Sequence, residues 1–164
     1  MRFADDPTVE VSVHIDASPD RVWPFVTDVA VPAEFSSEFQ GAEWEEGFDS
    51  PVLGARFRGT NELDGRPQWQ TTSEIVECDE PRAFAWAVMN VKNPSATWRF
   101  TLHTDGGGTR LTYFARMGPG PSGLTAAIEQ MPDKEERIIE RRLEHHRANM
   151  TATIEGIKRL AEGV

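Results

Sequence analysis

Cysteine, basic residues and long apolar runs are all scarce in this sequence. Its only cysteine is Cys78, so no internal disulfide can form, which fits a reducing compartment such as the cytoplasm. No apolar stretch approaches the ~18 residues needed to cross a bilayer, and the N-terminal MRFADDPTVE is acidic without an apolar core. We therefore expect a cytoplasmic protein with neither a transmembrane helix nor a secretory signal.

Basic residues are outnumbered by acidic ones. Lys and Arg total 17 against 27 Asp and Glu, which gives a formal net charge of −10 at pH 7. Binding to nucleic acid or to an anionic membrane surface depends on clustered Lys and Arg, so neither partner is expected. The imbalance is local, because residues 22–55 contain no Lys or Arg. This acidic segment carries seven acids: Asp28, Glu34, Glu38, Glu43, Glu45, Glu46 and Asp49. Such a run usually forms a solvated face, and a protein partner is the alternative.

Motifs for metals, phosphates and nucleophilic catalysis are also missing. The four His and one Cys show no clustered ligand spacing, and Glu144-His145-His146 is not the H-E-x-x-H arrangement. Gly106-Gly107-Gly108 precedes an expected strand, whereas phosphate-binding loops precede helices. Ser122 does not lie in a G-x-S-x-G elbow. We expect no metal and no cofactor.

Hydrophobic periodicity predicts the elements that are present. Val9 to Ile15 alternate with polar residues, as in a strand with one buried face. Ser18-Pro19-Asp20 then provides a helix start, and Pro24 is expected to bend or tighten that short helix. Pro32 opens a second short helix through Phe35.

Further alternating runs predict strands over 55–62, 68–75, 84–90, 97–103 and 111–117, joined by short turns. Consecutive runs of this kind favour an antiparallel sheet with one solvated face. Residues 118–123 break the pattern, and apolar residues then recur every three or four positions from Ile139 to Ala161. This spacing predicts a long helix from about residue 133 to 162, with a shorter turn of helix around 124–130.

The same order of elements resembles the START-like superfamily, also called SRPBCC, of polyketide cyclase/dehydrase-like and lipid-transport-like proteins. The resemblance is carried by VSVHIDASP with Val22-Trp23, by GARFRG at 54–59, and by Trp98-Arg99-Phe100 before GTRLT at 108–112. It implies one α+β domain over residues 1–164 with a helix-grip fold. In that fold an antiparallel sheet of about seven strands wraps around the C-terminal helix, two short helices follow the first strand, and a cavity holds an apolar ligand.

Alternation names the residues expected to face that cavity. They form an aromatic set with a few polar groups, which suits a small-molecule site. The predicted ligand-binding residues are Phe57, Asn61, Trp69, Thr71, Ser73, Trp86, Trp98, Phe100, Tyr113, Leu143, His146 and Met150. Each aromatic could instead fill the core, as large apolar residues commonly do.

His146 and Tyr113 are the candidate catalytic residues. His146 interrupts the apolar stripe of the last helix, and its imidazole could bind a ligand carbonyl or act as a general base. The alternative is a core histidine hydrogen-bonded to Asn61 or Tyr113. Tyr113, the only tyrosine, could likewise donate to a ligand or be an ordinary core residue.

The leading functional hypothesis is binding of a small hydrophobic or aromatic molecule between sheet and helix. The alternatives are a polyketide cyclase or aromatase-dehydratase type of enzyme that uses the same cavity, and a protein-interaction module without a ligand. If the acidic segment borders the cavity mouth, it favours neutral or cationic ligands over free fatty acids.

Overall fold

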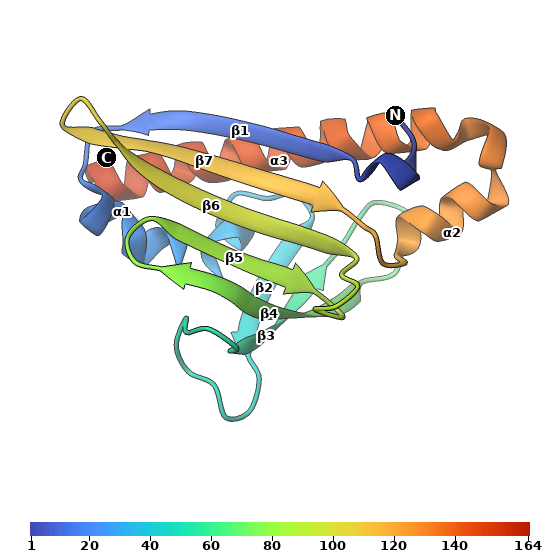
Figure 1. Cartoon of the computed structure of the whole chain (residues 1–164), viewed down its shortest axis with the longest axis horizontal. Helices are drawn as coiled ribbons and strands as arrows, with labels where there is room; N and C mark the ends of the chain where they lie inside the picture. The colour runs from blue at the N-terminus through green and yellow to red at the C-terminus, as the bar shows by residue number, and fades with distance from the viewer.

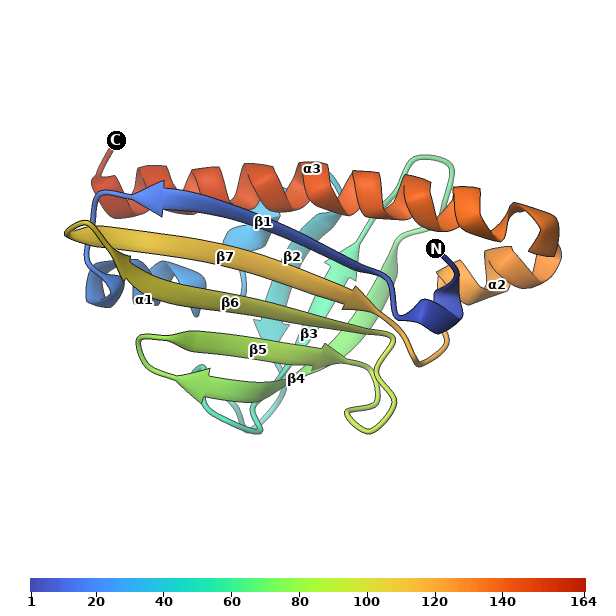
Figure 2. The ribbon, with the colours of Figure 1, turned by 45° about the horizontal axis from the view of Figure 1, so that its top comes forward.

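A computed structural model describes all residues 1–164 and has an α+β helix-grip architecture. One antiparallel sheet of seven strands has the order β1-β7-β6-β5-β4-β3-β2. It curls over one face of the long helix α3, which runs the length of the molecule (Figures 1 and 2). The fold class predicted from the sequence is therefore confirmed.

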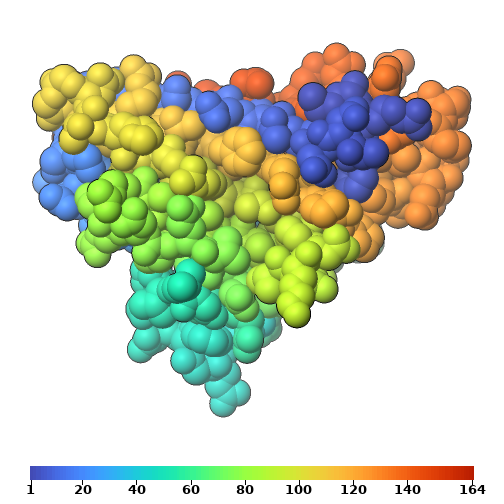
Figure 3. Space-filling model, viewed as in Figure 1, coloured from blue at the N-terminus to red at the C-terminus, as the bar shows by residue number.

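The strands are those that alternation predicted, with one addition. Their bounds are β1 Thr8–Ile15, β2 Phe39–Trp44, β3 Arg56–Asn61, β4 Trp69–Asp79, β5 Ala83–Val88, β6 Ala96–Asp105 and β7 Gly108–Met117. The edge strand β2 has a register shift between Phe39 and Gly41, so its pairing with β3 is irregular. Residues 45–55, between β2 and β3, project away from the body of the molecule (Figure 3).

Two α-helices, α1 and α3, pack against this sheet, and a third, α2, packs against α3. The helix α1 (Pro19–Val26) begins at Ser18, whose Oγ accepts a hydrogen bond from the backbone N–H of Arg21 at 3.3 Å. It continues for only two residues beyond Pro24. The remaining helices are α2 (Gly123–Gln130), α3 (Glu135–Glu162) and the short 3₁₀ helices η1 (Phe3–Asp5), η2 (Val31–Glu34) and η3 (Pro132–Lys134). None of these helices is both long and apolar enough to cross a membrane.

The core lies between the concave face of the sheet and α3. A cluster of 22 buried apolar residues joins the inner faces of the strands with α1 and α3. Ile154, Ile157 and Ala161 of α3 are at most 1% exposed, which places the C-terminal half of the helix against this core. Nearer the middle of α3, polar residues replace apolar ones, and there a pocket opens.

Candidate functional site

The pocket has a volume of about 110 Å³ and is enclosed by three parts of the chain. The sheet contributes Phe57, Gly59, Asn61, Thr71, Ser73, Phe84, Trp86, Val88, Trp98 and Tyr113. The helix α3 contributes His146, Asn149, Met150 and Thr153. The segment from the end of α1 to the start of β2 contributes Val26, Asp28, Val29, Pro32, Ser36, Glu38 and Phe39. Drug-sized ligands occupy about 300–1,000 Å³, so this pocket suits a smaller molecule.

Aromatic rings form the wall on the side of the sheet. Trp86 and Trp98, paired across β5 and β6, stack with 6.5 Å between ring centroids and 14° between planes. Tyr113 of β7 lies 5.7 Å from Trp98 and stacks on Phe100 at 4.0 Å. These rings come from neighbouring strands because inward positions of paired strands lie opposite one another.

His146 lies opposite this wall, on α3. Its ring meets Trp98 edge to face at 5.1 Å, and the residue is 5% exposed. It makes no hydrogen bond to Asn61, to Tyr113 or to any other protein group, so the core hydrogen bond considered from the sequence does not form. Burial, with the nearby positive charges of Arg142 and His145, holds the pKa of His146 well below its usual 6.5. The imidazole is therefore neutral at pH 7 and offers one donor and one acceptor.

Tyr113 is a second largely buried residue of the pocket whose polar group has no partner in the protein. The residue is 4% exposed, lines the pocket, and its hydroxyl has no hydrogen-bond partner in the protein. Burial raises the pKa of Tyr113 far above its usual value of 10, so the phenol stays protonated. The only fully buried side-chain nitrogen or oxygen without a partner is Nε of Arg116, so the polar atoms of Tyr113 and His146 are open to the pocket. A neutral imidazole and a phenol that both lack partners thus face one aromatic pocket.

A polar network closes the pocket between α3 and the residues that precede β2. Arg142 donates a hydrogen bond from Nη2 to Glu38 Oε1 at 2.7 Å. Asn149 Oδ1 accepts hydrogen bonds from the backbone N–H of Ser37 at 2.9 Å and from its Oγ at 3.0 Å. The structure places Arg142 in an ion pair with Glu38 and close enough to His146 to lower its pKa.

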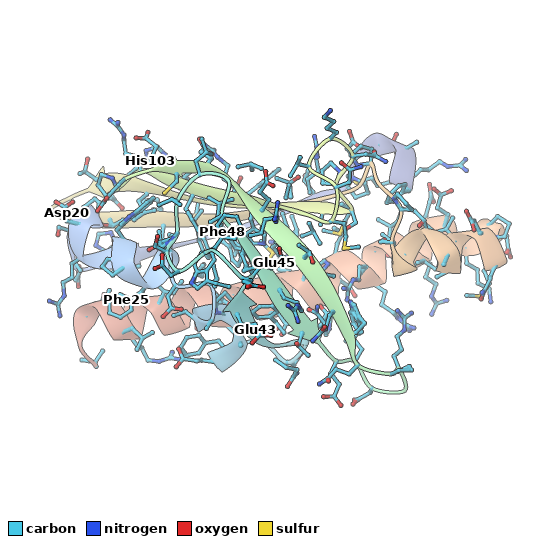
Figure 4. The ribbon with its side chains drawn as sticks, turned by 90° about the horizontal axis from the view of Figure 1, so that it is seen from below. Asp20, Phe25, Glu43, Glu45, Phe48 and His103 are labelled. Carbon is cyan, nitrogen blue, oxygen red and sulfur yellow. The ribbon has the colours of Figure 1, made fainter.

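The charges of the pocket lining are all negative. Asp28 and Glu38 are the only charged residues among those that line it, and no Lys or Arg does. Other acids of the segment 22–55 are paired with arginines of β3: Glu43 with Arg58 at 3.7 Å and Glu45 with Arg56 at 3.0 Å. Glu43 lies in β2 and Glu45 follows its last residue, both on the side of the molecule that Figure 4 shows. The acidic segment is thus partly neutralised across strands.

Nine of the twelve residues predicted to bind ligand line this one pocket. They are Phe57, Asn61, Thr71, Ser73, Trp86, Trp98, Tyr113, His146 and Met150. Three others do not line it. Phe100 is 0% exposed and lies against Tyr113, Trp69 stands at the first position of β4, and Leu143 packs at the edge of the core. The alternation of apolar and polar residues along the strands predicted which residues face inward. It did not predict which of these inward residues reach the pocket.

Twelve lining residues were not among the predicted ligand-binding residues, and half of them lie in 28–39. This segment has no sustained periodicity, and the register shift in β2 hides the inward position of Phe39. A Cβ at Gly59 would lie 2.7 Å from the Phe39 ring, so the glycine makes room for that ring at the pocket. Only the run of acidic residues drew attention to this segment. It includes Glu38 but does not predict that Glu38 is buried. No three His, Cys, Asp or Glu side chains converge on a metal-binding geometry.

Comparison with known proteins identifies relatives of this fold. The family described as polyketide cyclase / dehydrase and lipid transport matches residues 6–155. The solution structure of the Polyketide_cyc-like protein Cgl2372 from Corynebacterium glutamicum is 28% identical, with a TM-score of 0.66 and coverage of 94% of this chain and 91% of that one. A search of curated proteins gave no match.

More distant structures share the fold at lower identity. The di-domain ARO/CYC protein BexL, from the BE-7585A biosynthetic pathway, is 19% identical with a TM-score of 0.70. The alignment covers 95% of this chain and 50% of BexL, so this chain corresponds in length to half of that protein. Ara h 8.0201 is 13% identical with a TM-score of 0.61, over 96% of this chain and 99% of that one.

Proposed function

The chain belongs to the polyketide cyclase / dehydrase and lipid transport family, and from that premise we propose that it binds a small, neutral, hydrophobic or aromatic molecule between its sheet and α3. The observation that carries the proposal is a pair of pocket residues, His146 and Tyr113, whose polar groups have no partner in the protein and lie beside an aromatic wall. Apolar area supplies affinity, and a few hydrogen bonds fix orientation. We propose that residues 1–164 form the single domain that binds this ligand.

The size of the pocket limits the ligand. An engineered apolar cavity of about 150 Å³ binds benzene, which is close to the 110 Å³ available here. A single-ring aromatic therefore suits the pocket without rearrangement, and a larger ligand requires the residues of 28–39 or the aromatic side chains to move.

A pocket-filling variant tests this proposal. Ser73 is 3% exposed and lines the pocket, so Ser73→Leu should occupy it, whereas Ser12→Leu adds the same side chain at an exposed position on β1. Binding of single-ring aromatics is measured by ligand-observed NMR and dye displacement. The proposal expects binding to the wild type and to Ser12→Leu, and loss in Ser73→Leu. It fails if no aromatic or lipid-like compound binds, or if both variants bind equally.

An enzymatic role in the same pocket is the second candidate. The neutral imidazole of His146 could remove a proton from a carbon next to a carbonyl, while the hydroxyl of Tyr113 donates a hydrogen bond to the oxygen that gains the charge. Both rings flank Trp98, with centroids 5.1 and 5.7 Å from it. In a reconstituted cyclisation of a poly-β-carbonyl chain, His146→Ala should then abolish acceleration, and an unchanged rate would exclude His146 from the mechanism.

Two sequence-based expectations remain predictions. The expected cytoplasmic location is based on the single Cys78, which cannot form an internal disulfide. Its thiol donates a hydrogen bond to the carbonyl of Pro51. Docking of a protein partner on residues 22–55 would require the exposed acids of that segment. A pull-down with Glu43 and Glu46 changed to Gln would report on it, because neither residue lines the pocket.

A further inference from the structure

Glu38 is the only acidic residue that is buried in this protein, with 7% exposure. It lies immediately before β2, where its carbonyl accepts a hydrogen bond from the backbone N–H of Glu62 at 2.8 Å. Its side chain reaches α3 and receives Arg142 on Oε1 at 2.7 Å. A buried carboxylate is costly unless both of its oxygens find donors.

The second oxygen of Glu38 has no donor in the protein. His145 Nε2 faces this oxygen but lies 4.0 Å from Oε2, beyond hydrogen-bond distance. That nitrogen accepts a hydrogen bond from Asn149 Nδ2 at 3.1 Å, since Asn149 Oδ1 is already held by Ser37. His145 therefore carries its proton on the other ring nitrogen when it is neutral, and it cannot donate to Glu38.

The unfilled acceptor borders the pocket. Glu38 lines the pocket together with His146, and its partner Arg142 precedes His146 by one helical turn. Side chains four residues apart on a helix are neighbours, at about 5–6 Å. Glu38 and His146 therefore border the same region, next to Trp98.

We propose that Glu38 determines ligand specificity by accepting a hydrogen bond from a hydroxyl group, so that the pocket selects neutral phenols over aromatics without a donor. This rests on the proposed function. A phenol adds no net charge beside Arg142 and His145, and its ring can pack on the aromatic wall. Its O–H donates a hydrogen bond to Oε2 of Glu38. Hydrogen bonds to a charged acceptor are stronger than those between neutral groups.

A pair of matched ligands tests the inference in the unmodified protein. 4-Methylphenol carries the donor, and 4-methylanisole has the same ring and oxygen but no O–H. NMR titration should show that the phenol binds at least about tenfold more tightly, the range expected for a hydrogen bond to a charged group. Equal affinities would overturn the inference and leave the proposed function standing, whereas failure of both ligands and of all other aromatics would overturn both.

Variants assign the preference to a residue. Glu38→Gln should reduce it to less than about threefold, and Glu43→Gln, at an exposed site paired with Arg58, should leave it unchanged. Loss of one member of a buried ion pair can unfold a protein. The double variant Glu38→Leu/Arg142→Leu removes the pair together, and it too should lose the preference. A preference that survives in the Glu38 variants but disappears in His146→Phe would assign the acceptor to His146 and overturn the inference.

Discussion

His146 can be protonated in the folded protein only at a cost in free energy. Its pKa lies well below 6.5 when folded because of burial and of the charges on Arg142 and His145, and it returns to about 6.5 on unfolding. Below pH 6.5 the unfolded chain binds a proton that the folded chain does not. The contribution of this residue to stability is therefore fully present above pH 6.5 and falls as the pH drops toward the folded pKa.

Replacing His146 should flatten that pH dependence. Denaturant unfolding of His146→Phe at pH 7.5 and pH 5.0 should show a smaller loss of unfolding free energy on acidification than the wild type. His103→Phe is the control, because His103 is exposed on β6 (Figure 4). Equal losses in His146→Phe and the wild type would mean that His146 is protonated without penalty. The half-buried His14, whose pKa is raised by hydrogen bonds to Asp105 and Asp16, acts in the opposite direction in both proteins.

Substitution of Tyr113 distinguishes a role of its hydroxyl in ligand binding from a role in stability. Tyr113→Phe removes a hydroxyl that has no partner in the protein and preserves the stacking on Phe100 at 4.0 Å. The unfolding free energy should change by less than about 1 kcal/mol, because no internal hydrogen bond is lost. Affinity for an oxygen-bearing ligand should fall by about fivefold, the value of one neutral hydrogen bond. A variant that is destabilised by more than about 2 kcal/mol and binds ligand normally would show that the hydroxyl serves the fold.

At the scale of elements, η2 is held against α3 by close packing at one glycine. A methyl group at Gly156 would lie 2.5 Å from ring atoms of Phe35, and Arg159 covers the same ring at 5.9 Å. Alanine is favoured over glycine within a helix by about 1 kcal/mol, but the clash displaces the ring. Gly156→Ala should therefore destabilise the protein in thermal unfolding.

A smaller side chain at position 35 should rescue the Gly156→Ala variant. Gly156→Ala combined with Phe35→Leu should be more stable than Gly156→Ala alone, because the smaller side chain frees the space that the methyl group needs. Two changes whose effects simply add would mean that Phe35 and Gly156 do not contact each other.

The elements also show why sequence reasoning succeeded only in part. Regular alternation identified six strands, and the helical stripe of α3 identified His146 and Met150 as inward residues. The strand β2 escaped because a register shift at Gly41 interrupts its alternation. Alternation also treats every inward residue alike, whereas Phe100 is sealed beneath Tyr113 and does not reach the pocket. Contact between 28–39 and α3 joins positions more than 100 residues apart, for which no local pattern exists.

The whole molecule has a net charge of −10, and its pocket is likewise negative, because two carboxylates and no Lys or Arg line it. A carboxylate ligand should therefore bind more weakly than its neutral ester. We expect 4-methylbenzoate to bind at least about tenfold more weakly than methyl 4-methylbenzoate in 10 mM salt, about 1.4 kcal/mol. Screening by salt should reduce the part of this difference that comes from exposed acids and leave the part that comes from buried Glu38. Equal affinity at low salt would contradict the electrostatic argument.

The proposed function places a small aromatic molecule between the sheet and α3. Intermolecular nuclear Overhauser effects from bound 4-methylphenol test it most directly, because they report which protons lie next to the ligand. We expect contacts from the ligand ring to the Met150 methyl group on α3 and to the rings of Trp98 and Tyr113 on the sheet, which line the pocket on opposite sides. Contacts only to exposed side chains, such as Val52 and Leu53, or no contacts at saturating ligand, would contradict it.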